Sequence, residues 1–241
     1  FPNNLPHKYS RFIGRKKEIA EIEASLHEHR LVTLAGAGGI GKTRLAIEAA
    51  HNILSDYPDG AWLVELAPLA DPGLVLQQTA SILGVLESGE DSQNTAQQRL
   101  TLLARLTNAL QEKQLLLVLD NCEHVIDACA ALVDHLLEHC SGLHILVTSR
   151  ETLEVEGELV LRIPALSLPK TDESDLDQLA ASEAVQLFID RASVTAPGFT
   201  LTGENARFIS QICIRLDGIA LAIELAASRV KLLGVEGIAN R

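Results

Sequence analysis

The stretch LVTLAGAGGIGKTRL, residues 31–45, decides the fold. An apolar run rich in Leu, Val and Thr gives way to glycines and then to a segment with helical periodicity, which predicts a strand, a loop and a helix. Residues 36–43 fit the pattern G-x-x-x-x-G-K-[ST] of a phosphate-binding P-loop. The loop consists of Gly36, Ala37, Gly38, Gly39, Ile40, Gly41, Lys42 and Thr43, and Arg44 follows it in the helix.

This loop has the chemistry to hold a nucleotide. Its glycines let successive backbone N–H groups turn inward at a helix N-terminus, where they and the helix dipole attract an anion. The pattern predicts that Lys42 reaches the β- and γ-phosphates and that the Thr43 hydroxyl ligates Mg²⁺.

The same glycines allow a second interpretation. Gly36, Gly38 and Gly41 also fit G-x-G-x-x-G, the dinucleotide fingerprint, with Glu65 at the end of the next apolar run as the acid that would bind the ribose. Lys42 and Thr43 favour the P-loop, because a Rossmann turn needs close helix packing after its third glycine and neither a cation nor a metal ligand.

Composition limits the class of protein. The chain has 241 residues, room for one large or two small domains, and is 47% hydrophobic but only 3% aromatic. That balance is typical of an aliphatic core in an α/β or helical protein. No apolar run approaches the roughly 18 residues of a membrane helix and no signal peptide opens the chain, so a cytoplasmic protein without membrane contact is expected.

Charge is distributed unevenly along the chain. The net charge is −12, yet residues 1–50 carry 8 Lys or Arg against 5 Asp or Glu, while residues 51–241 carry 12 against 27. The only mildly basic part therefore surrounds the phosphate loop. This predicts a nucleotide as partner and no direct nucleic-acid binding by this fragment.

Further apolar runs predict a parallel five-stranded sheet. The run QLLLVLDN is apolar enough for a strand buried on both faces, and it ends in Asp120, which matches a Walker B acid that coordinates Mg²⁺. A helix cap is the alternative role for Asp120. Besides residues 31–35, the expected strands are 61–66, 114–121, 143–150 and 158–163.

The run LHILVTSR ends in Arg150. Ligands of parallel α/β sheets bind beyond the carboxyl ends of the strands, so Arg150 can approach a terminal phosphate with two hydrogen bonds. A surface ion pair with a nearby glutamate is the alternative.

Periodicity also predicts the helices and the domain boundary. Helices are expected after Gly14, after the P-loop as far as Leu54, and at 72–84, 95–111 and 127–140, with an acidic mobile loop at 87–94. In the helix at 127–140, the thiols of Cys129 and Cys140 should face the core, and His135 and His139 should face water rather than bind zinc. Residues 164–177 predict a linker, and helices are expected at 182–193, 204–216 and 219–232. The expected domains are therefore a nucleotide-binding domain at 1–164 and a helical domain at 165–241, whose last residues look like a helix cut off near its start.

With these pieces in order, the chain resembles the STAND class of signalling ATPases, which includes the NB-ARC-like switches of plant disease-resistance proteins, apoptosome scaffolds and large bacterial transcriptional regulators. The likeness lies in GAGGIGKT, LLLVLDN and VTSR, in FIGRKKE at 12–18, and in LDGIALAIELAA at 216–227. NCEH after the Walker B strand is most similar to the regulator branch. The resemblance implies an AAA+-like domain and a helical ARC1-like domain, with the winged-helix domain of the family missing from this fragment.

The resemblance also implies roles for individual residues. In the family, the segment that corresponds to Phe12, Ile13, Gly14 and Arg15 borders the adenine, as do the positions of Ala220 and Leu221, and the arginine at Arg150 contacts the γ-phosphate. Two departures stand out: Ala220 replaces a usual proline, and Asn121 replaces an acid that positions the attacking water. Asn121 cannot act as a base, so hydrolysis is expected to be slow unless Glu123 substitutes.

Together these features predict an ATP/ADP-binding, Mg²⁺-dependent, slow ATPase that acts as a conformational switch in signalling or transcription, with ATP-dependent self-association of the full-length protein. Two alternatives are a non-hydrolysing ADP-binding scaffold and, less favoured, an NAD-linked oxidoreductase.

Overall fold

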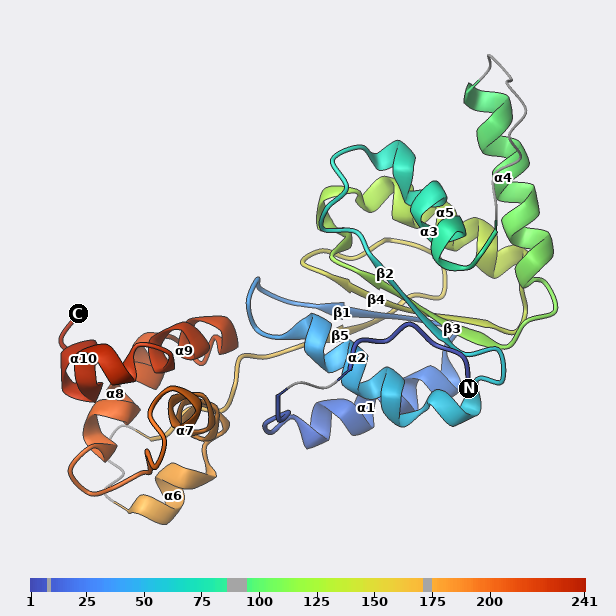
Figure 1. Ribbon diagram of the computed structural model, residues 1–241. Helices are drawn as coiled ribbons and strands as arrows, with labels where there is room; N and C mark the ends of the chain where they lie inside the picture. Colours follow the sequence, from blue (N-terminus) through green and yellow to red (C-terminus); the bar gives the residue numbers. More distant parts are fainter. Residues whose placement is uncertain (8–9, 86–94, 171–174) are drawn as a thin grey trace. The chain divides into compact units, whose positions relative to one another are not determined.

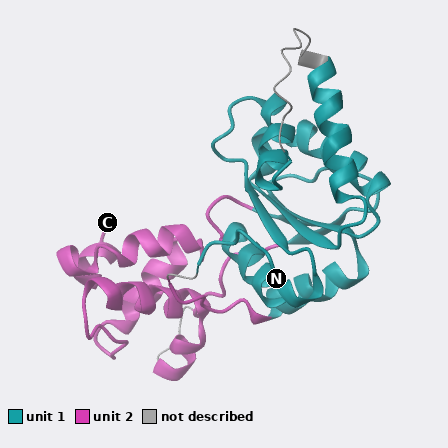
Figure 2. Ribbon diagram, turned by 45° about the vertical axis from the view of Figure 1, so that its right-hand side comes forward, with its two compact units in different colours: residues 1–8, 17–36, 42–162 teal, residues 9–16, 37–41, 163–241 magenta. Residues whose placement is uncertain are grey.

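The computed structural model describes residues 1–7, 10–85, 95–170 and 175–241. The chain forms two compact units (Figure 2). Unit 1 comprises residues 1–8, 17–36 and 42–162, and unit 2 comprises residues 9–16, 37–41 and 163–241. Most of the P-loop, residues 37–41, thus groups with the C-terminal helices, as does the segment that contains Gly14 and Arg15. The division into domains at residue 164 remains a proposal.

Unit 1 is built on five parallel strands in the order β2-β3-β4-β1-β5 (Figure 1). The parallel α/β sheet predicted from the sequence is therefore confirmed, and each strand falls where an apolar run predicted it. The strands are β1 (Leu31–Ala35), β2 (Ala61–Glu65), β3 (Leu115–Asp120), β4 (Leu143–Ser149) and β5 (Leu159–Arg162).

Helices cover both faces of this sheet. On one face lie α1 (Lys16–Glu28) and α2 (Lys42–Asn52), and on the other lie α3 (Val75–Ile82), α4 (Thr95–Leu110) and α5 (Ile126–His139) (Figure 1). Because both faces are covered, every residue of β1 and β3 is buried, as a central parallel strand requires. Short 3₁₀ turns complete the unit at Leu54–Asp56, Pro72–Leu74 and Cys122–His124.

Two details of unit 1 differ from the sequence-based expectation. Residues 72–74 form a 3₁₀ turn in which Asp71 accepts a hydrogen bond from the Gly73 N–H, so the helix predicted from residue 72 begins only at Val75. Cys129 and Cys140 are fully buried as predicted, but His135 is half-buried because it hydrogen-bonds Thr107 Oγ1 at 3.1 Å. The loop predicted at 87–94 lies outside the described residues.

Unit 2 adds a helical cluster with its own core. Its helices are α6 (Leu176–Ala181), α7 (Glu183–Thr195), α8 (Ala206–Arg215), α9 (Ala220–Ala227) and α10 (Val230–Ala239). Phe188, Ile209, Cys213 and Ile223 are buried at its centre, and Ile13 packs against the same cluster.

The C-terminal helices correct two sequence-based boundaries and confirm a third. The segment expected as one helix at 219–232 is two helices, which are separated at Ser228. The sequence did not predict this break because its run of Ala, Ile and Leu contains no Gly or Pro at that point. Gly234 (φ 66°, ψ 163°) is non-helical and divides α10 into two helical segments, so a helix starts after it, as the last residues of the sequence predicted. The expected linker ends earlier than residue 177, since α6 begins at Leu176.

One further property concerns membranes. Within the described ranges, no helix combines the length and the apolar character needed to cross a bilayer.

Candidate functional site

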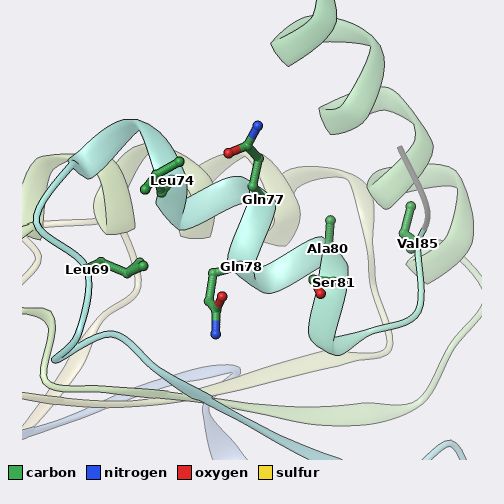
Figure 3. A pocket seen from close by; sticks show the side chains of 7 residues that line it. All are labelled: Leu69, Leu74, Gln77, Gln78, Ala80, Ser81 and Val85. Carbon is green, nitrogen blue, oxygen red and sulfur yellow. The ribbon is translucent and has the colours of Figure 1, made fainter. Parts of the chain in front are cut away.

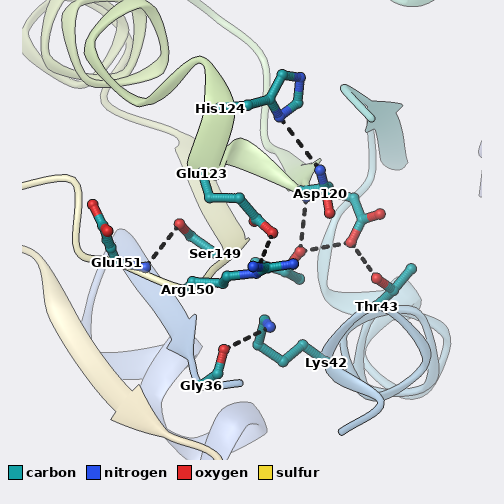
Figure 4. Close-up of polar contacts among 11 residues, drawn as sticks. Gly36, Lys42, Thr43, Asp120, Glu123, His124, Ser149, Arg150 and Glu151 are labelled. Atoms are coloured by element: carbon teal, nitrogen blue, oxygen red, sulfur yellow. Dashed lines mark hydrogen bonds and ion pairs between the residues drawn. The ribbon is translucent and has the colours of Figure 1, made fainter. Parts of the chain in front are cut away.

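Asp120 lies at the centre of a group of hydroxyls at the carboxyl edge of the sheet. Its Oδ1 accepts hydrogen bonds from Thr43 Oγ1, in the first turn of α2, and from Thr148 Oγ1 on β4, both at 2.6 Å (Figure 4). Asp120 is only 7% exposed. Parallel pairing explains the arrangement, because β4 lies beside β3 and both strands end at this edge.

Lys42 begins α2 beside this group. Its Nζ donates to the Gly36 carbonyl at 2.8 Å (Figure 4). Burial lowers the pKa of Lys42 from its ordinary value; the Arg150 charge acts in the same direction, and the Glu123 and Asp120 carboxylates oppose the shift. An anion bound here would favour the charged ammonium and raise this pKa.

The peptide after Asp120 turns sharply at Asn121, which has left-handed backbone angles (φ 66°, ψ 55°). Its N–H donates to Thr148 Oγ1 at 3.0 Å, and its side-chain Nδ2 lies 3.4 Å from His124 Nδ1. His124 Nε2 in turn lies 3.1 Å and 2.9 Å from the carbonyls of Leu66 and Leu69, so its Nε2–H is the donor and Nδ1 is free to accept. These bonds join the turn after β3 to the segment after β2.

Glu123 and Arg150 form an ion pair. Arg150 Nε lies 3.0 Å from Glu123 Oε1, with the Arg150 side chain 63% exposed and that of Glu123 19% exposed (Figure 4). Glu123 Oε2 is buried, and no described residue hydrogen-bonds it. Arg150 therefore forms the ion pair with a glutamate that the sequence analysis gave as its alternative role. Its partner is Glu123, the residue that could substitute for the missing acid at Asn121.

The remaining P-loop residues have a strongly bent backbone within unit 2. Gly39 (φ 78°) and Gly41 (φ 96°) are both in the left-handed region, and Ala37 and Gly38 are exposed. The Gly39 carbonyl accepts from the Leu221 N–H at 2.9 Å, and the Ile40 carbonyl accepts from Arg15 Nη2 at 3.2 Å. Two of the residues that the resemblance places beside the adenine, Arg15 and Leu221, thus hydrogen-bond the phosphate loop.

The other adenine-associated residues also belong to unit 2. Phe12 and Ile13 are half-buried, and Arg15 is 4% exposed with φ 60°. Ala220 is the first residue of α9, and a Cβ on Gly41 would lie 4.0 Å from the Ala220 Cβ.

Strand order argues against the dinucleotide interpretation. A Rossmann sheet places β2 next to β1, so that the acid ending β2 reaches the ribose of a cofactor bound after β1. Here β4 and β3 separate β2 from β1, and Glu65 at the end of β2 pairs in register with Asp120. Glu65 is thus removed from the position that the fingerprint requires.

Sequence reasoning missed two polar groups of this region. Thr148 lies within VTSR, but only the arginine drew attention; a hydroxyl two residues before the end of an apolar strand is the signal that could have found it. Glu183 accepts the Arg15 N–H at 2.6 Å across 168 residues, and no local pattern encodes that contact.

A hollow elsewhere in unit 1 holds none of the predicted site residues. It lies along α3, lined by Leu69, Leu74, Gln77, Gln78, Ala80, Ser81 and Val85 (Figure 3). The polar edge of the sheet remains the candidate site.

A parallel sheet with a P-loop after β1 and a buried acid at the end of β3 defines the P-loop ATPase class. Within that class, the Novel STAND NTPase 1 family matches residues 5–190, and the chain belongs to this family. The recognition of a STAND-class protein from the sequence is thereby confirmed.

Known relatives extend well beyond this chain. A protein named as an HTH-type transcriptional regulator from Mycobacterium tuberculosis is 43% identical over 220 residues, which are 91% of this chain and 22% of that protein. The regulatory protein AfsR of Streptomyces coelicolor is 30% identical over 249 residues, covering 95% of this chain and 22% of AfsR. The chain thus spans about a fifth of the length of these relatives.

A solved structure agrees on the fold. The STAND protein with a tetratricopeptide repeat sensor from Pyrococcus horikoshii superposes with a TM-score of 0.56 at 18% identity, over 92% of this chain and 30% of that one.

Proposed function

We propose that this chain is the nucleotide-binding module of a regulatory switch, which binds ATP or ADP with Mg²⁺ and hydrolyses ATP slowly. The observation that carries the proposal is the hydroxyl of Thr43 held 2.6 Å from the buried Asp120 carboxylate, directly after a P-loop lysine. Family membership supports an NTPase, and the regulators among the relatives support a role in controlling transcription.

The donor set fits magnesium. Thr43 and Asp120 offer hydroxyl and carboxylate oxygens, the hard ligands that Mg²⁺ prefers alongside phosphate and water. The direct hydrogen bond between them would give way to a shared cation. Held by Thr43 and Asp120, Mg²⁺ would supply positive charge that stabilises the charge developing on the phosphates during hydrolysis.

Other groups of the chain would bind the phosphates and the adenine. The backbone N–H groups of residues 36–43 would bind the phosphates, and Lys42 would exchange the Gly36 carbonyl for the β- and γ-oxygens. Arg150 would reach the γ-phosphate only after leaving Glu123. Phe12, Ile13, Gly14, Arg15, Ala220 and Leu221 would border the adenine.

Slow hydrolysis follows from the groups after Asp120. Asn121 has no basic oxygen, and its amide is engaged by His124. Glu123 is paired with Arg150, so a water-positioning carboxylate becomes available only when that pair opens. The same pairing favours the second candidate function, an ADP-binding scaffold that never hydrolyses.

Nucleotide binding is the decisive test. We expect purified protein to release ADP or ATP on denaturation, and emptied protein to bind both in calorimetry, with Mg²⁺ strengthening ATP binding. Lys42→Ala should abolish tight ATP binding, whereas Lys113→Ala, which removes a half-exposed lysine paired with Asp59, should not. Binding by Lys42→Ala at wild-type affinity would contradict the P-loop assignment.

Two further measurements separate the finer functions. Asp120→Ala should retain some nucleotide affinity but lose the Mg²⁺ increment; an undiminished increment would remove Asp120 from the metal site. Single-turnover assays with excess protein should show slow conversion of ATP to ADP. Intact ATP after many hours would leave the scaffold as the function.

A further inference from the structure

We infer that Glu183 is a positioning residue of the P-loop: through the Gly14–Arg15 turn it fixes the peptide groups that present N–H donors to phosphate. The inference rests on the proposed nucleotide binding and adds a residue outside every motif of the sequence. All groups involved belong to unit 2.

The first step is the contact between Glu183 and the turn. Glu183 is the first residue of α7, and its Oε1 accepts the Arg15 N–H at 2.6 Å. A Cβ built on Gly14 would lie 2.4 Å from the same Oε1, and Gly14 has φ 68°. Only glycine therefore fits beneath this carboxylate in this backbone conformation.

The second step is that the carboxylate is itself held in place. Glu183 Oε2 accepts the Ser167 N–H at 3.2 Å, and Ser167 Oγ accepts the Glu183 N–H at 3.0 Å. The Ser167 carbonyl accepts from Ser182 Oγ at 2.7 Å and from the Ala184 N–H at 3.2 Å. This reciprocal pairing leaves the Glu183 side chain little freedom, and the helix N-terminus favours its charge.

The third step connects the turn to the P-loop. Arg15 has a left-handed backbone (φ 60°), which costs a non-glycine residue on the order of 1 kcal/mol. The Glu183 contact offsets that cost and directs the buried guanidinium so that its Nη2 donates to the Ile40 carbonyl at 3.2 Å.

The last step is the geometry of the peptide group. In a trans peptide the C=O and the following N–H point in opposite directions. A carbonyl of Ile40 that is fixed on Arg15 therefore turns the Gly41 N–H to the other side of the chain, and a Gly39 carbonyl fixed on the Leu221 N–H does the same for the Ile40 N–H. Two successive N–H groups on one side make an anion-binding nest.

Hydrogen exchange on the 241-residue chain tests this without relying on activity. Glu183→Ala should speed amide exchange in peptides that cover 12–16 and 37–41, relative to wild type. ADP and ATP should both weaken about tenfold, the loss expected for a charged hydrogen bond, because the nest serves either nucleotide. Glu204→Ala, which removes an exposed glutamate of unit 2, is the matched control and should change neither readout.

Two additional variants keep the test decisive. Glu183→Gln retains one acceptor oxygen for the Arg15 N–H but loses the acceptor for the Ser167 N–H, so it should recover part of the affinity that Glu183→Ala loses. Arg15→Ala should weaken both nucleotides as Glu183→Ala does, and the double variant should be no weaker than Arg15→Ala alone. Additive losses, or unchanged exchange at 37–41 in Glu183→Ala, would overturn the inference. Absence of nucleotide binding by the wild type would instead contradict the proposed function, while exchange would still report on the Glu183 contact.

Discussion

Thr148 Oγ1 lies 2.6 Å from Asp120 Oδ1 and donates its proton there, while it accepts the Asn121 N–H at 3.0 Å. One hydroxyl on β4 thus fixes both the acid that ends β3 and the peptide that follows it. Because Thr43 donates to the same Oδ1, Thr148 holds the carboxylate in reach of α2.

Thr148→Val should therefore reduce the gain in ATP affinity that Mg²⁺ provides more than it reduces nucleotide affinity itself. Valine keeps the shape but leaves a buried carboxylate oxygen and the Asn121 N–H with fewer partners, at a cost of about 1–3 kcal/mol in unfolding free energy. We expect urea unfolding to show this loss and calorimetry to show a smaller Mg²⁺ increment for ATP. Thr148→Ser keeps the hydroxyl and serves as control. If Mg²⁺ raised the ATP affinity of the valine variant as much as that of wild type, Asp120 would not need the Thr148 hydrogen bond to bind the metal.

Lys42 should make nucleotide binding sensitive to alkaline pH. Its pKa lies below 10.5 in the free protein, chiefly through burial, and bound phosphates would raise it. Below the free-protein pKa the lysine is charged in both states, and affinity does not depend on its titration. Above that pKa, binding must take up a proton, so affinity falls as pH rises until the pKa of the complex is reached.

The check is ADP affinity measured from pH 7 to pH 10 in wild type and in Lys42→Arg. Arginine stays protonated throughout, so the variant should bind with a flatter pH profile. An identical slope in both proteins would assign the effect to another group.

Arg150 should discriminate between the two nucleotides. A charge-assisted contact with the γ-phosphate alone is worth about 1.5–3 kcal/mol, so Arg150→Ala should weaken ATP roughly 10- to 150-fold and spare ADP. Because Glu123 holds Arg150 in the free protein, Glu123→Gln should tighten ATP by releasing it. Arg99→Ala, which removes an exposed arginine of α4, is the matched control. Equal losses for ATP and ADP in Arg150→Ala would make the ion pair purely structural.

The fold of unit 1 was predictable because its signals are local. Five apolar runs bounded by turn residues gave the strands, and the P-loop and Asp120 are each encoded within a few residues of one strand end. Parallel pairing then brings Thr43, Asp120 and Arg150 to one edge of the sheet.

The contacts that shape the loop were not predictable in this way. Glu183 and Arg15 are 168 residues apart, and nothing in the composition around Glu183 distinguishes it from any helix-starting glutamate. The break at Ser228 also has no local signal, since α9 and α10 are mostly apolar and neither Gly nor Pro lies between them. Tertiary packing, not local preference, decides these positions.

Ala220→Pro should be accepted by the fold. Ala220 is the first residue of α9, where proline is favoured because the missing N–H has no partner within the helix. Ile219 before it is extended (φ −70°, ψ 110°), the conformation that a following proline requires. Within the described part of the chain, the Ala220 N–H donates to no carbonyl outside the helices and strands. Thermal unfolding should therefore show unchanged or slightly raised stability.

The same substitution should slow ADP release. Proline fixes φ near −65° and restricts the backbone just before Leu221, whose N–H holds the Gly39 carbonyl of the P-loop at 2.9 Å. If Ala220 borders the bound nucleotide, as the resemblance implies, the stiffer backbone should tighten ADP binding by about 0.5–1 kcal/mol. The measurement is the off-rate of a fluorescent ADP analogue by stopped flow, with Ala222→Ser, two residues further along α9, as a control that leaves the first residue of the helix intact. A normally folded proline variant with an unchanged or faster off-rate would show that Ala220 does not face the nucleotide.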